Sequence, residues 1–557
     1  MMPKQYRESL RRKEKQVPVF LQEEGLDLTE LLSYADVEPE GKGPGTERRE
    51  LVIDADEKGR PLLHTWRRLI NIGYARDGLV EAVQRQLRLA QQEVGFEFVR
   101  FHGIFDEDMH VFAEDGNGEL NPNFIFVDML FDFLLAIGLK PFIEFGYVPK
   151  SLAVRPLRVL ERETYFSRVK DEEKWCALIR YFLEHVLARY GKSSVLTWRF
   201  TVGGSELKLQ GYLSGEDYLN HYAASFQAVK SVCPSLMVGG FGGHSSLILE
   251  VEEFQEFVEF GIEKSCVPDF FCIQNFPVEY VRKEEPVNPI LLRKLSPVTI
   301  SSDTHYSRNL LKKAEKILAK YQLSDRKIWF EEWNASIWQR DVANDTCYKA
   351  AWLVKDICEN YDRVEAFGYW LLTDFIEERL PDGSLAYFGG SSLITYNGIP
   401  KAGWNAMRLL RKLGDTFIAA GDGYFVTRRD HKIQILLYHY VHYGDMYRFC
   451  NQTPIHVDRA YDIFLKRADR RYQIRIRRKE GTFCRIRKYS VDREKGSSFD
   501  EWVRMGKPKY LEREEIVHLK ALASWGLWVS EQDTAGEVVI DTTLSAHACV
   551  FYELSYS

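Results

Sequence analysis

Eight short apolar runs, rich in β-branched and aromatic residues, alternate with amphipathic stretches of helical length along most of the chain. Residues 79–95 and 218–232 are two of these helical stretches. Eight strands that are each followed by a helix are typical of a (β/α)8 barrel, so the sequence predicts an α/β TIM barrel. The apolar runs are 69–75, 97–105, 140–148, 197–204, 235–243, 269–276, 328–334 and 366–374.

The alternation of strands and helices ends at about residue 415, and beyond it strand-like runs follow one another with few long helices between them. This spacing predicts a β-sandwich appended to the barrel. We therefore expect an N-terminal extension over 1–60, a (β/α)8 barrel over 61–415 and a β-sandwich domain over 416–557. The last domain could bind glycans or cover the barrel wall, and the structural role is the favoured interpretation.

Composition excludes several classes of function. With a net charge of −6, the 557-residue chain offers no basic surface for nucleic acid. The charged N-terminus lacks an apolar signal core, and no run of about 18 apolar residues is present to span a membrane. The nine cysteines contain no CxxC pair, which indicates reduced thiols and a cytoplasmic protein. Because HExxH and Gly-rich phosphate loops are absent, we expect no metal and no cofactor.

The polar residues at the ends of the predicted strands are mostly carboxylates, amides and aromatics. In such barrels the C-terminal strand ends surround one active-site mouth. Carboxylates handle protons and oxocarbenium-like charge, while Trp and Tyr rings stack on pyranoses, so a small glycoside or oligosaccharide is the expected partner. The main strand-end residues are Arg100, His102, Asp106, Asp108, Glu144, Tyr147, Glu206, Gln274, Asn275, Glu331, Glu332, Trp333, Asn334, Trp370, Asp374, Glu377 and Glu378.

Glu331 and Glu332 are neighbours in the seventh run. Successive side chains of a strand point to opposite faces, so only one of the two is expected to reach the mouth. Strand parity alone does not choose between them, and two rim salt bridges are the alternative interpretation.

Four segments extend the sequence evidence: FVRFHGIFDEDMHVF (98–112), KPFIEFGYVPKSLA (140–153), IWFEEWNAS (328–336) and GYWLLTDFIEE (368–378). They resemble glycoside hydrolase family 39, the β-xylosidase and α-L-iduronidase family, and the resemblance runs from about Trp66 to the C-terminus. It implies a retaining exo-β-xylosidase acting on small xylo-oligosaccharides, with Glu332 as the nucleophile. His102, Trp370 and Glu377 match sugar-contacting positions, and Gln274 stands at a further substrate-binding position.

The resemblance fails where the acid/base is expected. In the family this residue belongs to a Trp-Asn-Glu-Pro motif after the fourth strand, and here Gly203, Gly204 and Ser205 stand at its first three positions. A serine cannot donate a proton near neutral pH, so Glu206 is the candidate for a displaced acid/base. In the sixth run, Gln274 and Phe276 replace a His and a Tyr of the family.

Three hypotheses follow from these departures. The first is a working retaining glycosidase with Glu206 as a displaced acid/base. The second is a catalytically weak sugar-binding or sensing protein, because similar barrels are fused to AraC-type regulators. The third is an enzyme that recruits another acid or cleaves a different glycoside. The sequence leaves open whether the chain forms a homo-oligomer.

Overall fold

A computed structural model describes most of the chain after residue 45. The described residues are 46–154, 157–158, 165–203, 215–249, 252–280, 298–338, 340–374, 386–450, 455–478, 483–533 and 536–556.

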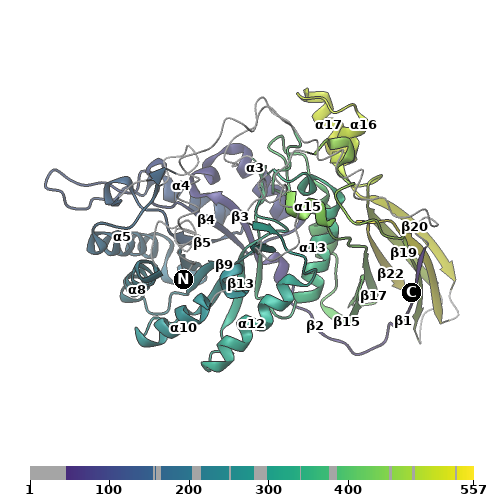
Figure 1. Cartoon of the computed structure of the whole chain (residues 1–557), viewed down its shortest axis with the longest axis horizontal. Helices are drawn as coiled ribbons and strands as arrows, with labels where there is room; N and C mark the ends of the chain where they lie inside the picture. Colours follow the sequence, from purple (N-terminus) through teal and green to yellow (C-terminus); the bar gives the residue numbers. More distant parts are fainter. Residues whose placement is uncertain are drawn as a thin grey trace.

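Eight parallel strands close into a barrel in the order β10-β13-β14-β3-β4-β5-β8-β9. Each strand falls within one of the eight apolar runs or extends it by a single residue, so the prediction of a (β/α)8 barrel is confirmed (Figure 1). The strands are β3 (Leu69–Tyr74), β4 (Phe98–His102), β5 (Lys140–Phe145), β8 (Arg199–Val202), β9 (Val238–His244), β10 (Phe270–Asn275), β13 (Lys327–Trp333) and β14 (Ala366–Tyr369).

Helices surround the barrel and bury their apolar faces against it (Figure 1). α5 begins where Asp171 accepts a hydrogen bond from the Lys174 amide at 2.9 Å, which satisfies a free N–H of its first turn. α13 differs from the other helices because it is buried on almost all sides. The longer helices are α3 (Glu81–Glu93), α4 (Ile125–Ala136), α5 (Glu172–Tyr190), α8 (Gly215–Val232), α10 (Glu253–Glu263), α12 (Tyr306–Lys320), α13 (Cys347–Asn360) and α14 (Ala402–Arg411).

An aromatic layer fills the N-terminal end of the barrel interior. Phe98, Phe142 and Phe270 surround Trp329 with ring centroids 5.1–5.8 Å from its own. These side chains come from the first residues of their strands, so the interior above them is left to the polar residues at the strand ends.

Ten further strands form two facing sheets beside the barrel (Figure 1). The seven-stranded sheet has the order β2-β15-β16-β17-β22-β19-β20, and the three-stranded sheet has the order β1-β18-β21. The two sheets enclose a second apolar core. Their strands are β1 (Glu47–Asp54), β2 (Arg60–Pro61), β15 (Thr416–Gly421), β16 (Tyr424–Arg429), β17 (Lys432–Tyr438), β18 (Arg470–Arg477), β19 (Phe483–Val491), β20 (Gly526–Asp533), β21 (Glu537–Leu544) and β22 (Cys549–Tyr556).

The segment before the barrel therefore supplies two strands to these sheets. β1 pairs in parallel with β18, and β2 pairs with β15. We call the two sheets and their connections the β domain. Shorter elements complete the fold: β6 (Leu157–Arg158), β7 (Tyr165–Phe166), β11 (Val278–Tyr280), β12 (Val298–Ile300), α6 (Lys192–Val195), α9 (Ser246–Leu249), α15 (Asp445–Cys450), α16 (Ser498–Arg504) and α17 (Arg513–Leu522).

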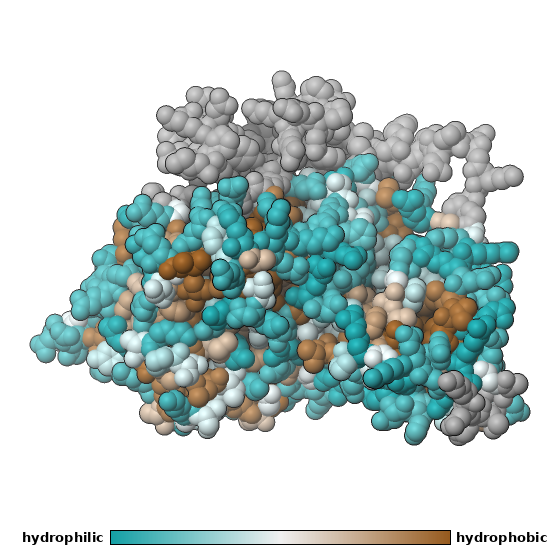
Figure 2. Space-filling view, turned by 90° about the horizontal axis from the view of Figure 1, so that it is seen from below, coloured by the Kyte–Doolittle hydropathy of each residue, from teal (hydrophilic) through white to brown (hydrophobic). Residues whose placement is uncertain are grey.

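The surface seen in Figure 2 is largely hydrophilic, with small apolar areas on the barrel and on the β domain. Within the described residues, none of the helices has the length and apolar character needed to cross a membrane. The eight cysteines described are all free thiols.

Candidate active site

The C-terminal mouth of the barrel brings together four of the six residues proposed from the sequence. Glu332, at the end of β13, lies opposite Gln274 of β10 in the strand register. His102 ends β4, and its ring stacks with that of Trp370 at 5.7 Å and 23°. Glu206 and Glu377 fall outside the described residues.

A single buried guanidinium organises the carboxylates of this mouth. Arg100 Nη1 donates to Glu332 Oε1 at 2.7 Å and to Asn71 Oδ1 at 3.1 Å. Nη2 donates to Glu144, and Nε lies 3.6 Å from Glu331 Oε2. Burial would lower the pKa of Arg100, but the three carboxylates outweigh it and raise this pKa well above its usual value. Arg100 is therefore a permanent cation that orients Glu332 and favours its ionised form.

Glu331 and Glu332 do not face opposite sides as the sequence predicted. Both carboxylates approach Arg100, because the register of β13 shifts between Phe330 and Trp333. Such a bulge lets two successive side chains point the same way. The Asn71 amide donates to the Glu331 carbonyl at 2.8 Å, which satisfies that backbone group. Glu332 keeps 8% of its surface exposed and Glu331 keeps 1%, so Glu332 has the better access to the mouth.

The Glu144 carboxylate occupies space that is open only because Gly146 and Gly203 have no side chains. A Cβ at Gly203 would lie 2.1 Å from Glu144 Oε1, and one at Gly146 would lie 2.6 Å from it. The absence of a side chain at Gly203 therefore makes room for the Glu144 carboxylate at Arg100.

Among the described residues, His102, Glu144 and Glu332 form a group whose possible ligand atoms lie within 4.8 Å of one another. Two of its members are carboxylates that already bind the Arg100 guanidinium. The Arg100 guanidinium would repel a divalent cation bound to the same carboxylates. The group therefore fits an ion-paired cluster better than a metal centre.

Aromatic rings form the wall beside Glu332. His102 makes edge contacts with Tyr74 at 4.3 Å and with Tyr147 at 5.1 Å, while Trp370 stacks on it. Trp370 is only partly buried. A carboxylate close to a partly exposed indole is an arrangement that could stack a sugar ring and act on its anomeric carbon.

Comparison with known proteins identifies the family. The model of glycosyl hydrolases family 39 matches residues 49–527. The chain belongs to this family.

Two relatives match most of the chain. A β-xylosidase of Caldicellulosiruptor saccharolyticus is 27% identical over 505 residues, which cover 87% of this chain and 94% of that protein. A β-xylosidase of Geobacillus stearothermophilus is 26% identical over 525 residues, covering 90% and 95%. The crystal structure of a monomeric β-xylosidase from Caulobacter crescentus has the same fold, with a TM-score of 0.78 at 23% identity over 91% of this chain and 99% of that one. This family 39 protein is thus a glycoside hydrolase that acts on O-glycosyl bonds.

One residue of the family 39 mouth was missed in the sequence. His244 ends β9, lies opposite Gln274 in the register and stacks on Phe276 at 5.9 Å and 9°. Burial lowers its pKa to about 4, so the ring is neutral at physiological pH. Its Nδ1 bonds Ser246 Oγ at 2.9 Å. The signal was its position directly after the GGFGG run, at a strand end where active-site residues gather.

Proposed function

We propose that this family 39 protein is a retaining exo-β-xylosidase that acts on small xylo-oligosaccharides, with Glu332 as its nucleophile. The observation that carries the proposal is the position of the Glu332 carboxylate, bound to Arg100 and close to His102 at the mouth of the barrel. The names of the two long-matching relatives support xylose as the sugar.

In the proposed reaction, Glu332 attacks the anomeric carbon and forms a glycosyl-enzyme that water then hydrolyses. Arg100 keeps the carboxylate ionised and aimed, while Trp370 and His102 would line the sugar subsite. Glu377 and Gln274 are further proposed sugar contacts. The acid/base is proposed to be Glu206, which should approach to about 5–5.5 Å from Glu332 in a retaining enzyme.

We also propose a cytoplasmic location. The eight free thiols are consistent with a reducing compartment. A cytoplasmic enzyme would meet short imported oligosaccharides, so its place in xylan degradation would be the last cleavage steps.

Leaving-group dependence tests this function. A dinitrophenolate departs with little protonation, whereas a sugar alkoxide needs an acid. We expect measurable turnover of dinitrophenyl β-xyloside, low activity on xylo-oligosaccharides and a modest acceleration by azide that yields β-xylosyl azide. If Glu206 serves as acid/base, Glu206→Ala should impair oligosaccharide cleavage far more than aryl xyloside cleavage.

A catalytically weak sugar-binding protein is the second candidate, and Ser205 at the family's acid/base position is the feature that favours it. Absence of turnover of any xyloside, with or without azide, would reject the enzyme and support this alternative. Calorimetric titration with xylose and xylobiose would then measure binding directly.

A further inference from the structure

Three side-chain hydrogen bonds hold the segment that follows the proposed nucleophile, and their partners lie outside the residues that line the mouth. Trp333 Nε1 donates to Asp356 Oδ2 at 2.7 Å. Lys349 donates to the Asn334 amide oxygen. Ser336 Oγ donates to Asp341 Oδ2 at 3.3 Å. We call residues 332–336 the nucleophile segment.

Asn334 also ties the end of the seventh barrel strand to that of the eighth. Its amide nitrogen donates to the Trp370 carbonyl and, at 3.2 Å, to the Ser391 carbonyl. The positions of Glu332 and of the proposed sugar platform Trp370 are therefore linked through one fully bonded amide.

Asp341 is the point where the β domain meets this network. It is fully buried and accepts from Tyr447 Oη at 2.7 Å, from Tyr443 Oη at 3.5 Å and from the Ala343 amide at 2.9 Å. Burial raises the pKa of Asp341, and the Tyr447 hydroxyl opposes that shift by binding the ionised form. The two tyrosines follow β17 and belong to the β domain, whereas Asp341 and Ser336 belong to the barrel.

The turn that begins at Asp341 also contacts the loop after the eighth strand. Asn344 donates to the Gly389 carbonyl at 2.7 Å, and the Gly389 amide donates to Asp345 at 2.7 Å. Gly389 has φ of +81°, and a Cβ there would lie 2.7 Å from the Asp341 backbone. One short turn thus contacts the loops after both strands.

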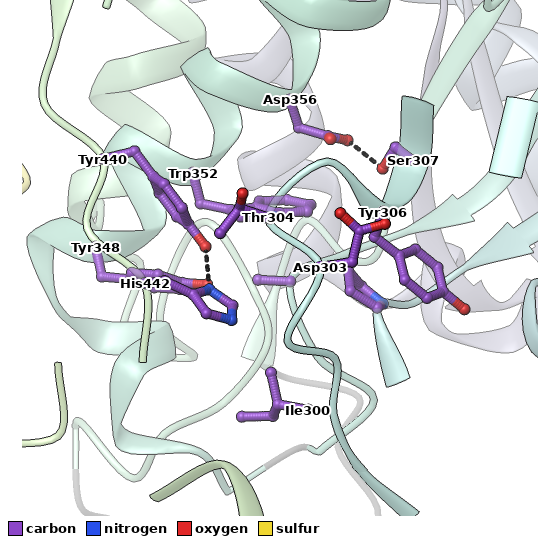
Figure 3. Close-up of a pocket in the computed structure, with 12 residues that line it drawn as sticks. Ile300, Asp303, Thr304, Tyr306, Ser307, Tyr348, Trp352, Asp356, Tyr440 and His442 are labelled. Carbon is purple, nitrogen blue, oxygen red and sulfur yellow. Dashed lines mark hydrogen bonds between the residues drawn. The ribbon is translucent and has the colours of Figure 1, made fainter. Parts of the chain in front are cut away.

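Aromatic side chains of the β domain near Tyr443 also pack against α13. Tyr348 of α13 contacts Tyr443 at 4.7 Å and Phe464 at 4.8 Å. Tyr440 and His442 of the β domain line a small pocket together with Tyr348, Trp352 and Asp356 of α13, and Figure 3 shows His442 lying beside Tyr348. α13 carries Lys349 and Asp356, so the packing that fixes this helix also fixes two of the three supports of the nucleophile segment.

We propose that Asp341 is a positioning residue of the sugar site, and that the β domain acts on the nucleophile segment through the tyrosine hydroxyls that bind Asp341. The role of the β domain is then to set the geometry of catalysis as well as to cover the barrel wall. This inference rests on the proposed function, since it assigns a role to residues behind Glu332.

The test removes only hydroxyl groups. Tyr443→Phe/Tyr447→Phe leaves the rings in place but withdraws two donors from a buried carboxylate. Of the donors described above, Asp341 then keeps the Ala343 amide and the Ser336 hydroxyl, so its carboxylate should lose its fixed orientation and hold Ser336 less firmly. We expect kcat on dinitrophenyl β-xyloside to fall about tenfold, the size of effect that follows from one misplaced charge-assisted hydrogen bond. KM should change less, because the indole and His102 are not altered.

Tyr472→Phe is the matched control. Tyr472 is equally buried in the β domain, and its hydroxyl donates to the Gly423 carbonyl at 3.3 Å, away from α13. Tm should fall slightly in both tyrosine variants, but kcat should change only in the double variant.

Substitution of Asp341 itself should have a larger effect. Asp341→Ala should reduce kcat more than the double tyrosine variant does. Asp341→Asn should reduce kcat less than Asp341→Ala, because the amide keeps one acceptor oxygen.

Hydrogen–deuterium exchange of the peptide covering 328–340 provides a readout that does not depend on turnover. Faster exchange in the double variant than in Tyr472→Phe supports the inference, even if the unmutated protein cleaves no xyloside and the proposed function fails. Unchanged kcat in an active enzyme, or unchanged exchange in this peptide, would overturn it and leave the tyrosines with a purely structural role.

Discussion

At the scale of single residues, the site depends on one cation shared by three acids. Arg100 contacts Glu144, Glu331 and Glu332 in a buried setting, where an unpaired charge would be costly. The resemblance of the Glu-Trp-Asn block predicted Glu332 as the nucleophile, and the sequence pattern placed Arg100 and Glu144 at strand ends. It could not show that these residues form one cluster, because the bulge that turns Glu331 toward Arg100 depends on pairing with neighbouring strands.

The two adjacent glutamates should respond differently to substitution. We expect Glu332→Ala to reduce kcat on aryl β-xylosides by at least about a thousandfold, since it removes the attacking carboxylate. Glu331→Gln keeps the shape beside Arg100 and should cost less than about tenfold. Steady-state kinetics of both variants, with folding checked by circular dichroism, decides the assignment. Equal losses would mean that the nucleophile has been chosen wrongly.

Gly203 offers a second residue-scale test. In Gly203→Ala the new methyl group would displace Glu144 from Arg100, so we expect about 2 kcal/mol lower stability, typical of overpacking, together with reduced activity. Gly116→Ala is the control, because a Cβ there meets nothing within 4 Å. Thermal unfolding and kcat of the two proteins should differ clearly. Identical behaviour would show that Glu144 is not confined by Gly203.

At the scale of elements, the apolar runs predicted the eight strands because each strand buries one face in the barrel interior and the other against the surrounding helices. The sequence did not predict what supports the strand ends. α13 reads as an ordinary helix, yet its residues Lys349 and Asp356 bond the nucleophile segment from behind. Such contacts join residues that neither periodicity nor motif spacing connects, so they emerge only when the elements are packed.

The contact between the β domain and the barrel should be sensitive to acid through His442. Its ring bonds Tyr440 Oη at 2.6 Å and the Ser301 carbonyl at 2.9 Å. Burial lowers its pKa to about 4, with Arg448 and Lys355 adding to the shift and the Ser301 carbonyl and Asp445 opposing it. The unfolded chain binds a proton below about pH 6.5 while the folded protein does not, so stability is lost as the pH falls from 6.5 toward 4.

His442→Gln should remove this part of the acid sensitivity, which amounts to about 2 kcal/mol between pH 7 and pH 5. Burial also raises the pKa of Asp356, which lines the same cavity, to about 6. This carboxyl adds stability as the pH falls, but it does so equally in the unmutated protein and in His442→Gln, so it cancels from the comparison. Urea unfolding at the two pH values gives the difference. His431→Gln, at an exposed turn, serves as control. An unchanged pH response in His442→Gln would contradict the assignment.

At the scale of the whole molecule, the barrel and the β domain are joined by chain segments far apart in sequence. The first described strand, β1, pairs with β18 more than 400 residues later, at Glu47 and Arg470. The charged segment before residue 61 indicated an extension, and nothing in its local pattern pointed to that partner. The domain boundaries stay a prediction, but the shared sheets explain how the β domain is held close enough to reach Asp341.

The central claim is that Glu332 is the nucleophile of a retaining glycosidase. Incubation with dinitrophenyl 2-deoxy-2-fluoro-β-xyloside, followed by proteolysis and mass spectrometry, tests it directly, because the fluorine slows hydrolysis of the glycosyl-enzyme while the activated leaving group permits its formation. The account predicts a covalent xylosyl adduct on the peptide that contains residues 328–336, located at Glu332 by fragmentation and absent from Glu332→Ala. An adduct on Glu331 or on another carboxylate, or no adduct under conditions where the unmutated protein turns over the aryl xyloside, would contradict it.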